Sequence, residues 1–246
     1  MLLLAIDTSG PAVTAALSDG TAVLAAVHHD DPRRHAELLA PAIQTVLAEA
    51  GRSRTDLTDV VVGVGPGPFT GLRVGVVTAR VLGAALGIGV HGVCSLDALA
   101  AAAPAGLAAF LVATDARRRE VHWARYERDA AGLAVRVDGP HVSLPADVAA
   151  QLPTGGLPAG ALPVVGLPVV GLPVVGRGAA LYPAALGGPV PGAPLDVDGA
   201  ALARLAAAAL AAAPGSALAG VLLPPDPLYL RRPDAVEPGA RKRVLT

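Results

Sequence analysis

The amino-acid sequence predicts an α/β protein in which one structural plan occurs twice. Leu2 to Asp7 and Phe110 to Thr114 are short apolar strands, and each leads through an aspartate, Asp7 or Asp115, into a polar turn and two further strands. Strand–helix units follow both groups of strands, which is typical of α/β folds. The identity between the copies is low, so the repeat is one of pattern. The sequence therefore indicates two domains, residues 1–105 and 106–246, with the last helix and tail able to pack back on the first.

The elements of the first domain follow from the apolar pattern. A helix is predicted from His35 to Ala50, because apolar side chains recur on one face and Gly51 is a typical helix stop. A second helix is predicted to begin at Ser95, as its cap, and to end at Ala103. Strands are predicted at Leu2–Asp7, Val13–Ser18, Thr21–Val27, Val60–Val64 and Val90–Val93.

The segment from Val60 to Gly75, VVVGVGPGPFTGLRVG, predicts a strand, a tight elbow and a helix. Thr70 is the expected N-cap of that helix, which runs on to Leu86. Elbows at the carboxyl end of a buried strand often bind ligands in α/β proteins. Here, however, two prolines remove backbone N–H donors and no Lys follows the last glycine, so the elbow is not a Walker loop. The residues alone favour a rigid structural turn.

Small residues form a stripe along the helix that begins after the elbow. Gly or Ala recurs at every fourth position, at Gly71, Gly75, Ala79, Gly83 and Gly87. Such a stripe lets another backbone approach closely. That backbone could be a strand of the same sheet or a helix of another chain.

The second domain repeats the three-stranded opening. Strands are predicted at Phe110–Thr114, Val121–Tyr126 and Leu133–Val137, and Asp198 is predicted to cap a helix over Gly199–Ala213. The sequence LPVVG occurs three times in tandem between Leu162 and Gly176, and only the copy beside Arg177 is expected to contain a true strand. The basic groups at 117–119 and 241–243 are interpreted as solvated charge.

Composition narrows the class of protein. Of the 246 residues, 53% are hydrophobic and only 2% aromatic, so the core must be built from Ala, Val and Leu. The formal net charge of −1 argues against electrostatic binding of nucleic acid by this chain alone. Cys94 is the single cysteine, which excludes an internal disulfide and fits a reducing compartment. Long uncharged tracts are broken by Pro and Gly, so we expect a soluble, cytoplasmic protein with no membrane partner.

Few residues form a pattern with chemical potential. The sequence has no His pair at metal-ligand spacing, no Cys cluster and no G-x-S-x-G elbow. The only acids paired by the pattern are Asp7 and Asp115. With Thr8, they are the candidates for contact with a nucleotide, while no catalytic or metal-ligating residue is assigned.

Six segments together resemble a known family. They read IDTS from Ile6, RHAELL from Arg34, GPGPFTGLR from Gly65, SLDAL from Ser95, DAR from Asp115 and YLR from Tyr229. They look like the tRNA threonylcarbamoyladenosine biosynthesis protein TsaB (YeaZ) family, in the family's order and over nearly the whole chain. The GPG-x-FTGLR string is highly specific, and the other segments are weak alone. The resemblance implies the duplicated actin-like fold, related to ribonuclease H and shared with sugar kinases and Hsp70-type ATPases, with mixed sheets flanked by helices.

The resemblance also implies a role. Members of this family resemble TsaD but act as its non-catalytic partner and, with TsaE and TsaC-type proteins, take part in modifying adenosine 37 of tRNAs that read ANN codons. TsaD binds a metal through H-x-x-x-H, and the matching positions here are Ser95 and Leu99, neither of which is a useful ligand. The family often reads GDG where this chain has Arg177 between two glycines, which puts nucleotide contact by the second domain in doubt.

The partners implied by the resemblance are a TsaD homologue, the TsaE ATPase, tRNA through the complex, and a second copy when the chain is alone. No cofactor is expected on the chain itself, and ATP or ADP is expected, if anywhere, at the interface with TsaD. That interface is predicted on the helices at His35–Ala50 and Leu72–Leu86. The residues expected to bind the partner are His35, Leu39, Ile43, Gly71, Leu72, Arg73, Gly75, Val76, Ala79 and Arg80.

Two other classes of function stay open on the residues. An active ATPase or sugar kinase of the same fold would use Asp7 and Asp115 to place a metal-bound nucleotide. A glycoprotease-like metallopeptidase is the third class. A nucleotide-binding assay discriminates the ATPase or sugar kinase from a non-catalytic partner, and metal analysis discriminates the metallopeptidase.

Overall fold

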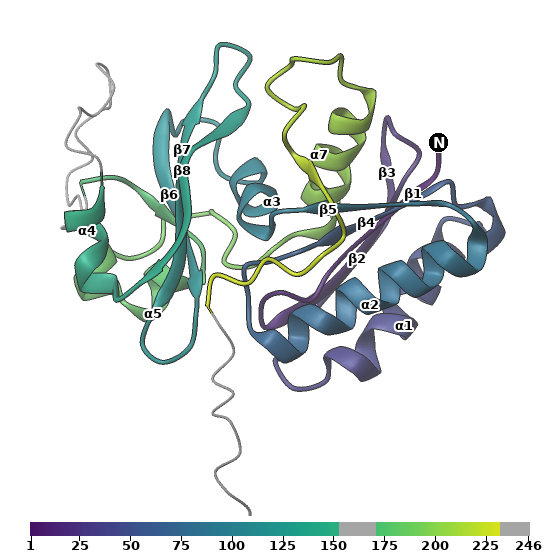
Figure 1. Ribbon diagram of the computed structural model, residues 1–246, viewed down its shortest axis with the longest axis horizontal. Coiled ribbons are helices and arrows are strands. Elements are labelled where there is room, and N and C mark those ends of the chain that lie inside the picture. Colours follow the sequence, from purple (N-terminus) through teal and green to yellow (C-terminus); the bar gives the residue numbers. More distant parts are fainter. Residues whose placement is uncertain (153–170, 232–246) are drawn as a thin grey trace, which may run out of the picture.

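In the computed structural model, which describes residues 1–152 and 171–231, the chain folds around two mixed β-sheets (Figure 1). The first sheet has the strand order β10-β5-β4-β1-β2-β3, and the second has the order β8-β7-β6-β9. The strands of the first sheet are β1 (Leu3–Asp7), β2 (Ala12–Ser18), β3 (Val23–Asp30), β4 (Asp59–Gly63), β5 (Gly89–Val93) and β10 (Leu222–Leu223). Those of the second are β6 (Ala109–Asp115), β7 (Val121–Arg128), β8 (Ala134–Ser143) and β9 (Val174–Val175).

The two sheets share one topology. In each, three successive strands form an antiparallel meander, and a fourth strand pairs in parallel with the first strand of that meander. The order β3-β2-β1-β4 thus recurs as β8-β7-β6-β9. The predicted fold class, a duplicated actin-like α/β fold with mixed sheets, is confirmed.

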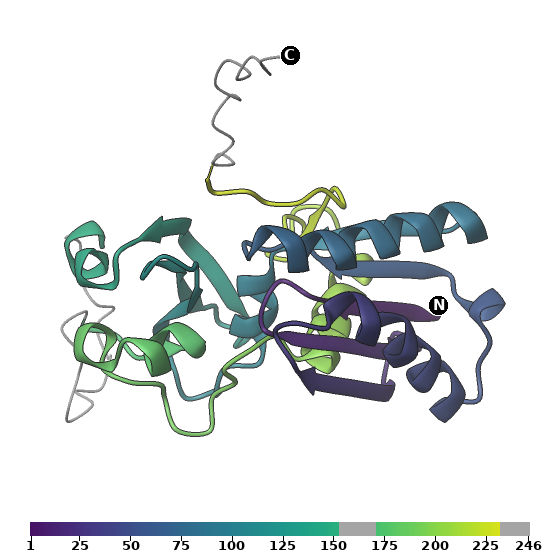
Figure 2. The same cartoon turned by 90° about the horizontal axis from the view of Figure 1, so that it is seen from below.

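Helices cover both faces of the first sheet (Figures 1 and 2). Alternate side chains of β1 point to opposite faces, so Leu4 and Ile6 pack beneath α1 and α2 while Leu3 and Ala5 join a core shared with α3 and α7. That second core also includes Phe110 of β6, so it continues into the second domain. The helices are α1 (His35–Glu49), α2 (Phe69–Leu86), α3 (Ser95–Ala101), α4 (Val148–Gln151), α5 (Arg177–Leu181), α6 (Pro183–Leu186) and α7 (Gly199–Ala211), with 3₁₀ turns at Arg54–Asp56 and Pro145–Asp147.

The end of the described chain returns to the first sheet. Asp198 caps α7 as predicted, because its carboxylate accepts the N–H of Ala200 at 2.9 Å. The N–H of Gly199 donates to the Thr14 hydroxyl at 2.9 Å, which fixes the start of α7 against β2. Strand β10 then extends the sheet beside β5. The predicted domain boundary near residue 105 stays a prediction.

Two predicted helix caps are wrong. The N-cap of α2 is Pro68, so Thr70 lies inside the first turn and is exposed. The N-cap of α3 is Cys94, because the hydroxyl of Ser95 is engaged elsewhere, with Asp7. The strand expected in the third LPVVG copy is confirmed as β9. The first copy, the second copy up to Val170, and the basic group at 241–243 lie outside the described residues.

Helix α2 is long and apolar enough, by length and composition alone, to cross a membrane. In this fold it instead packs on the first sheet, where Gly75 approaches Val62 of β4 and Gly83 approaches Val90 of β5. The Thr8 hydroxyl lies between two turns of the helix, donating to the carbonyl of Gly71 at 2.7 Å and accepting the N–H of Gly75 at 2.9 Å. A Cβ atom at Gly75 would stand 2.6 Å from that hydroxyl. The close approach is therefore made by the chain's own Thr8, the residue that follows β1.

This packing corrects the predicted partner surface. Six of the ten residues assigned to it are buried inside the first domain, although two of them, Gly71 and Val76, border surface hollows; the six are Leu39, Gly71, Leu72, Gly75, Val76 and Ala79. The assignment failed because α2 is apolar on more than one side, so the stripe did not reveal which side faces solvent.

We expect Gly75→Leu to destabilise the chain itself, because the added side chain would overlap Thr8. Overpacking of this kind costs about 1–3 kcal/mol. Thermal unfolding of the isolated chain measures the effect. Ala84→Leu places the same side chain on the exposed side of α2 and should leave the melting temperature near wild type. A Gly75→Leu variant as stable as Ala84→Leu would contradict the packing described.

Candidate functional site

The carboxylate of Asp7 lies buried at the carboxyl end of β1, where three segments meet. One oxygen, Oδ1, accepts the N–H of Ser9 at 2.7 Å and the Ser9 hydroxyl at 2.8 Å. The other, Oδ2, accepts the Ser95 hydroxyl at 2.6 Å. Ser95 Oγ in turn accepts the N–H of Gly65 at 3.0 Å, and the N–H of Ser95 donates to the Gly65 carbonyl at 2.8 Å. Asp7 thus connects β1, the elbow and the start of α3.

Burial raises the pKa of the Asp7 carboxyl, and the hydrogen bonds from Ser95 and Ser9 oppose that shift. The nearby Asp196 adds to the rise. A Cβ atom at Gly63 would overlap the carboxylate, so β4 can pass only because that residue is glycine. The geometry is that of a structural carboxylate enclosed by its own domain.

A cleft of about 200 Å³ opens between the domains above this network. Asp115 lines it, and its carboxylate accepts the N–H of Arg117 at 2.8 Å and lies 3.4 Å from the Arg117 guanidinium. Asp7 and Thr8 are not among the cleft-lining residues, because their side chains are used within the first domain. The structure therefore does not present the two predicted acids together, and nucleotide contact by Asp7, Thr8 or Asp115 stays a prediction.

Sequence reasoning missed how Arg177 fills one side of this cleft. Its guanidinium is ion-paired with Asp196 and lies 3.3 Å from Asp30 of β3, so it bridges the two domains. The glycines on either side are required, because a Cβ atom at Gly176 or Gly178 would overlap the backbone of Ala113. A cation held by two carboxylates thus stands at the start of α5, just after β9.

The two positions that match the TsaD metal ligands lie at the start of α3. The Ser95 hydroxyl is held by Asp7 and Gly65, and Leu99 is a fully buried aliphatic side chain. Neither offers a free donor atom to a metal. Among residues 1–152 and 171–231, no group of three His, Cys, Asp or Glu side chains could hold a metal ion.

The exposed side of α2 carries an apolar face that sequence reasoning also missed. Val77 and Val81 are 57% and 64% exposed, although valine is an apolar residue that is usually buried. They line a shallow hollow of about 490 Å³ with three of the predicted partner residues, Arg73, Val76 and Arg80, and with the tail residues Pro227 and Tyr229. Their spacing of four residues places them on one face of the helix, and that periodicity is the signal that could have identified it.

The tail fixes the polar rim of this face. Arg80 is ion-paired with Asp226 at 2.9 Å, and Arg73 Nε donates to the Tyr229 hydroxyl at 2.8 Å. Of the other predicted partner residues, His35 lies half-buried with Nε2 2.8 Å from the Gly10 carbonyl oxygen, and Ile43 is half-buried on α1. Partner binding by His35, Ile43, Arg73 and Arg80 stays a prediction.

Comparison with known proteins identifies the family. A family model described as "TsaD: tRNA N6-adenosine threonylcarbamoyltransferase" matches residues 26–159. An uncharacterised protein of Mycobacterium tuberculosis is 49% identical over 148 residues, covering 59% of this chain and 66% of the relative. The Escherichia coli tRNA threonylcarbamoyladenosine biosynthesis protein TsaB is 39% identical over 136 residues, covering 54% of this chain and 58% of the relative. The chain thus spans less than two thirds of the length of each of these relatives, 66% of one and 58% of the other.

Solved structures resemble the chain over a greater length. YeaZ from Pseudomonas aeruginosa superposes with a TM-score of 0.68 at 26% identity, covering 93% of this chain and 99% of that one. A second Pseudomonas aeruginosa structure, of a protein with similarity to peptidase YeaZ, has a TM-score of 0.72 at 28% identity and covers 94% and 99% of the two chains. The similarity therefore includes both sheets.

We expect Asp7→Ala to lower the free energy of unfolding by about 1–3 kcal/mol, because it leaves buried donors of Ser9 and Ser95 unsatisfied. Asp115→Ala should cost less, because its carboxylate borders the cleft and water can replace it. Urea unfolding of the two variants measures the difference. An Asp7→Ala variant that unfolds at the wild-type midpoint, or at a higher urea concentration than Asp115→Ala, would show that the buried network is not the structural centre described.

Proposed function

The chain belongs to the TsaD family, and within it to the TsaB/YeaZ group, and on that basis we propose that it is a non-catalytic subunit that binds and activates a TsaD-type enzyme. The reaction it supports is the threonylcarbamoylation of adenosine 37 in tRNAs that read ANN codons. The proposal extends to this chain what the names of its relatives say of them.

The observation that carries the proposal is the exposed apolar face of α2. Val77 and Val81 are large aliphatic side chains in solvent on a rigid helix, bordered by the cations Arg73 and Arg80. An apolar centre with a polar rim is the usual anatomy of a protein–protein interface. The same helix is held from behind by Thr8 and the glycine stripe, so its exposed face is fixed before a partner arrives.

The arrangement at α3 and β1 supports a non-catalytic role. The residues that match the TsaD metal ligands are Ser95, whose hydroxyl is hydrogen-bonded to Asp7, and Leu99, which is buried. The Asp7 carboxylate accepts hydrogen bonds from Ser9 and Ser95, so it is not available to a substrate. Catalytic chemistry therefore belongs to the TsaD-type partner in this proposal.

The remaining assignments complete the proposal. TsaE joins the complex as its ATPase, tRNA is bound through the complex, and any ATP or ADP lies at the interface with TsaD. Without that partner, the face of α2 is available to a second copy of the chain as a homodimer. The complex works in the cytoplasm.

We expect the purified chain alone neither to hydrolyse ATP appreciably nor to form threonylcarbamoyladenosine. The physical reason is that, in the described part of the chain, β1 and β6 do not present a pair of carboxylates to the cleft, and Arg177 occupies its side as an ion-paired cation. Steady-state phosphate release, and nucleoside analysis of modified tRNA with and without a TsaD homologue, measure this. An ATPase activity that copurifies with the chain through successive columns would favour the kinase-like alternative.

We expect Val77→Glu to weaken binding of the TsaD homologue by about tenfold or more, because a charge would replace apolar surface at the centre of the interface. Isothermal titration with the purified homologue gives the dissociation constant, and threonylcarbamoyladenosine formation should fall in parallel. The melting temperature of the isolated chain should not change, because Val77 is exposed.

Val137→Glu is the matched control, since Val137 is a 45% exposed valine on β8 of the other domain. It should bind the homologue like wild type. Equal loss of binding in both variants, or in neither, would place the interface away from α2.

A further inference from the structure

The two cations beside the apolar face of α2 differ in what holds them. The guanidinium of Arg80 is engaged by the carboxylate of Asp226, at 2.9 Å. The guanidinium carbon of Arg73 lies 3.5 Å from the centroid of the Phe69 ring, and its Nε donates to the Tyr229 hydroxyl at 2.8 Å. Within residues 1–152 and 171–231, the two terminal nitrogens of Arg73 have no acceptor and no carboxylate pairs with it. Arg73 is therefore a cation held by aromatic rings, with most of its donors open.

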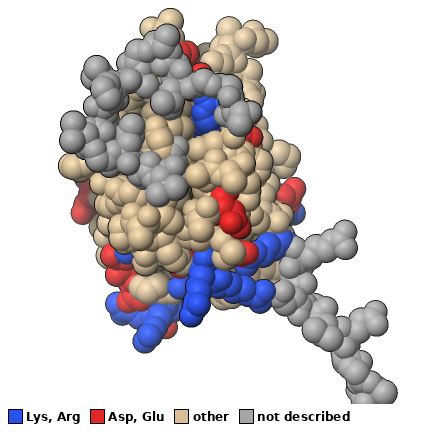
Figure 3. Space-filling model, turned by 90° about the vertical axis from the view of Figure 1, so that its left-hand side faces the viewer, with Lys and Arg blue, Asp and Glu red and all other residues tan. Residues whose placement is uncertain are grey.

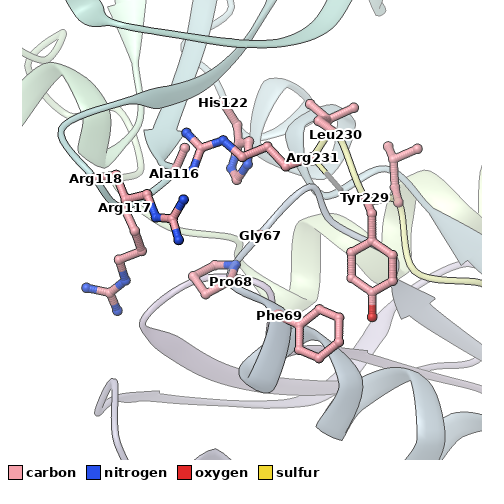
Figure 4. Close-up of a pocket in the computed structure, with 11 residues that line it drawn as sticks. Gly67, Pro68, Phe69, Ala116, Arg117, Arg118, His122, Tyr229, Leu230 and Arg231 are labelled. Carbon is pink, nitrogen blue, oxygen red and sulfur yellow. The ribbon is translucent and has the colours of Figure 1, made fainter. Parts of the chain in front are cut away.

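The rings fix the direction of this guanidinium. Phe69 and Tyr229 stack with ring centroids 5.1 Å apart, and Figure 4 shows them beside each other at the start of α2. The tail keeps Tyr229 in place, because the N–H of Leu228 donates to the Val64 carbonyl at 2.8 Å. A guanidinium stacked on a ring still presents its planar fork of donors, which matches a carboxylate. Since its orientation is already set, it loses little further freedom when it binds one.

The arginines near the end of the described tail do not share this property. Figure 3 shows basic side chains gathered beside that end. Arg117 and Arg231 each form an ion pair with a carboxylate of the chain, and Arg118 also has an interaction partner. An acid bound there would compete with contacts that already exist, whereas an acid at Arg73 would not.

Exposed apolar side chains continue the row that Arg73 begins. Val77, Val81 and Ala85 follow at intervals of four residues, and all three are exposed. From the rise per residue of an α-helix, the row is about 18 Å long. Rows at this spacing are the ridges that pack into the groove of a second helix. The face therefore suits a helix that places aliphatic side chains over the valines and an acid over Arg73.

We propose that Arg73 receives a carboxylate of the TsaD-type partner, carried on a helix whose aliphatic side chains cover Val77 and Val81. The pairing rests on the proposed function and specifies the chemistry of the partner's surface. Charge favours that partner over a second copy of the chain. Arg73, Arg80 and Asp226 together carry one net positive charge, and in a two-fold dimer this face would meet itself, cation against cation. Opposite charges across an interface favour association, and like charges oppose it.

Isothermal titration of the TsaD homologue with the full chain tests the pairing. Arg73→Gln removes the charge, and we expect it to bind about tenfold more weakly than wild type. Arg73→Lys keeps the charge without the planar fork, so it should recover only part of that affinity. The difference between wild type and Arg73→Gln should narrow as salt is raised, because salt screens the attraction between charges.

The matched control is Arg204→Gln. Arg204 is an exposed arginine of α7, which packs on the other face of the first sheet (Figure 1). The control should bind the homologue like wild type. Thermal unfolding of the three variants establishes that they are folded.

A double-mutant cycle identifies the acid of the partner. Exposed Asp and Glu residues of the homologue are changed one at a time to Asn and Gln, and each variant is titrated with wild type and with Arg73→Gln. One of them should weaken binding of wild type by about tenfold and leave binding of Arg73→Gln unchanged, because that pair is already broken. Losses that add for every acid changed would contradict the pairing.

Other results would overturn it as well. Wild-type affinity in Arg73→Gln, together with a loss in Val77→Glu, would keep the interface on α2 but exclude Arg73 from it. Equal weakening by Arg73→Gln and Arg204→Gln would show that only overall charge matters. Loss of self-association in Arg73→Gln, with unchanged binding of the homologue, would assign the face to a second copy. Failure of wild type to bind the homologue at all would overturn the proposed function, and this pairing with it.

Discussion

Burial of the Asp7 carboxylate is the constraint on which the first domain depends. A charged group can be enclosed only if hydrogen bonds replace the water it loses. Here the donors come from Ser9 beside it and from Ser95, which is 88 residues further along the chain. Satisfying one carboxylate therefore fixes the elbow at Gly65 and the start of α3 with respect to β1.

The next residue, Thr8, extends this constraint to α2. Its hydroxyl bonds to Gly71 and Gly75, so the small residues of the helix must face the sheet and the opposite side must face solvent. That geometry explains why Val77 and Val81 are exposed on a helix whose composition is mostly apolar. The surface assigned to a partner is thus a consequence of how β1 ends, and its orientation is as rigid as the buried network behind it.

The sequence was sufficient for the fold because strands, turns and caps such as Asp198 leave local patterns. The duplicated meander, and the strand in the last LPVVG copy, follow from such patterns. The site was predicted less well because its determinants are long-range. Nothing near Ser95 in the sequence indicates that its hydroxyl turns away from capping α3 to reach Asp7. Helical periodicity also could not choose between the stripe of Gly75 and the face of Val77, since both are apolar.

The central claim is that this chain acts through association with a TsaD-type enzyme, as the TsaB/YeaZ group to which it belongs suggests. The most direct measurement is the molar mass of the species formed when the chain and the TsaD homologue of the same organism are mixed, by size-exclusion chromatography with light scattering. The account predicts one new species that contains the two proteins in equal number. Two peaks at the masses of the separate proteins, at concentrations well above those used for activity, would contradict it.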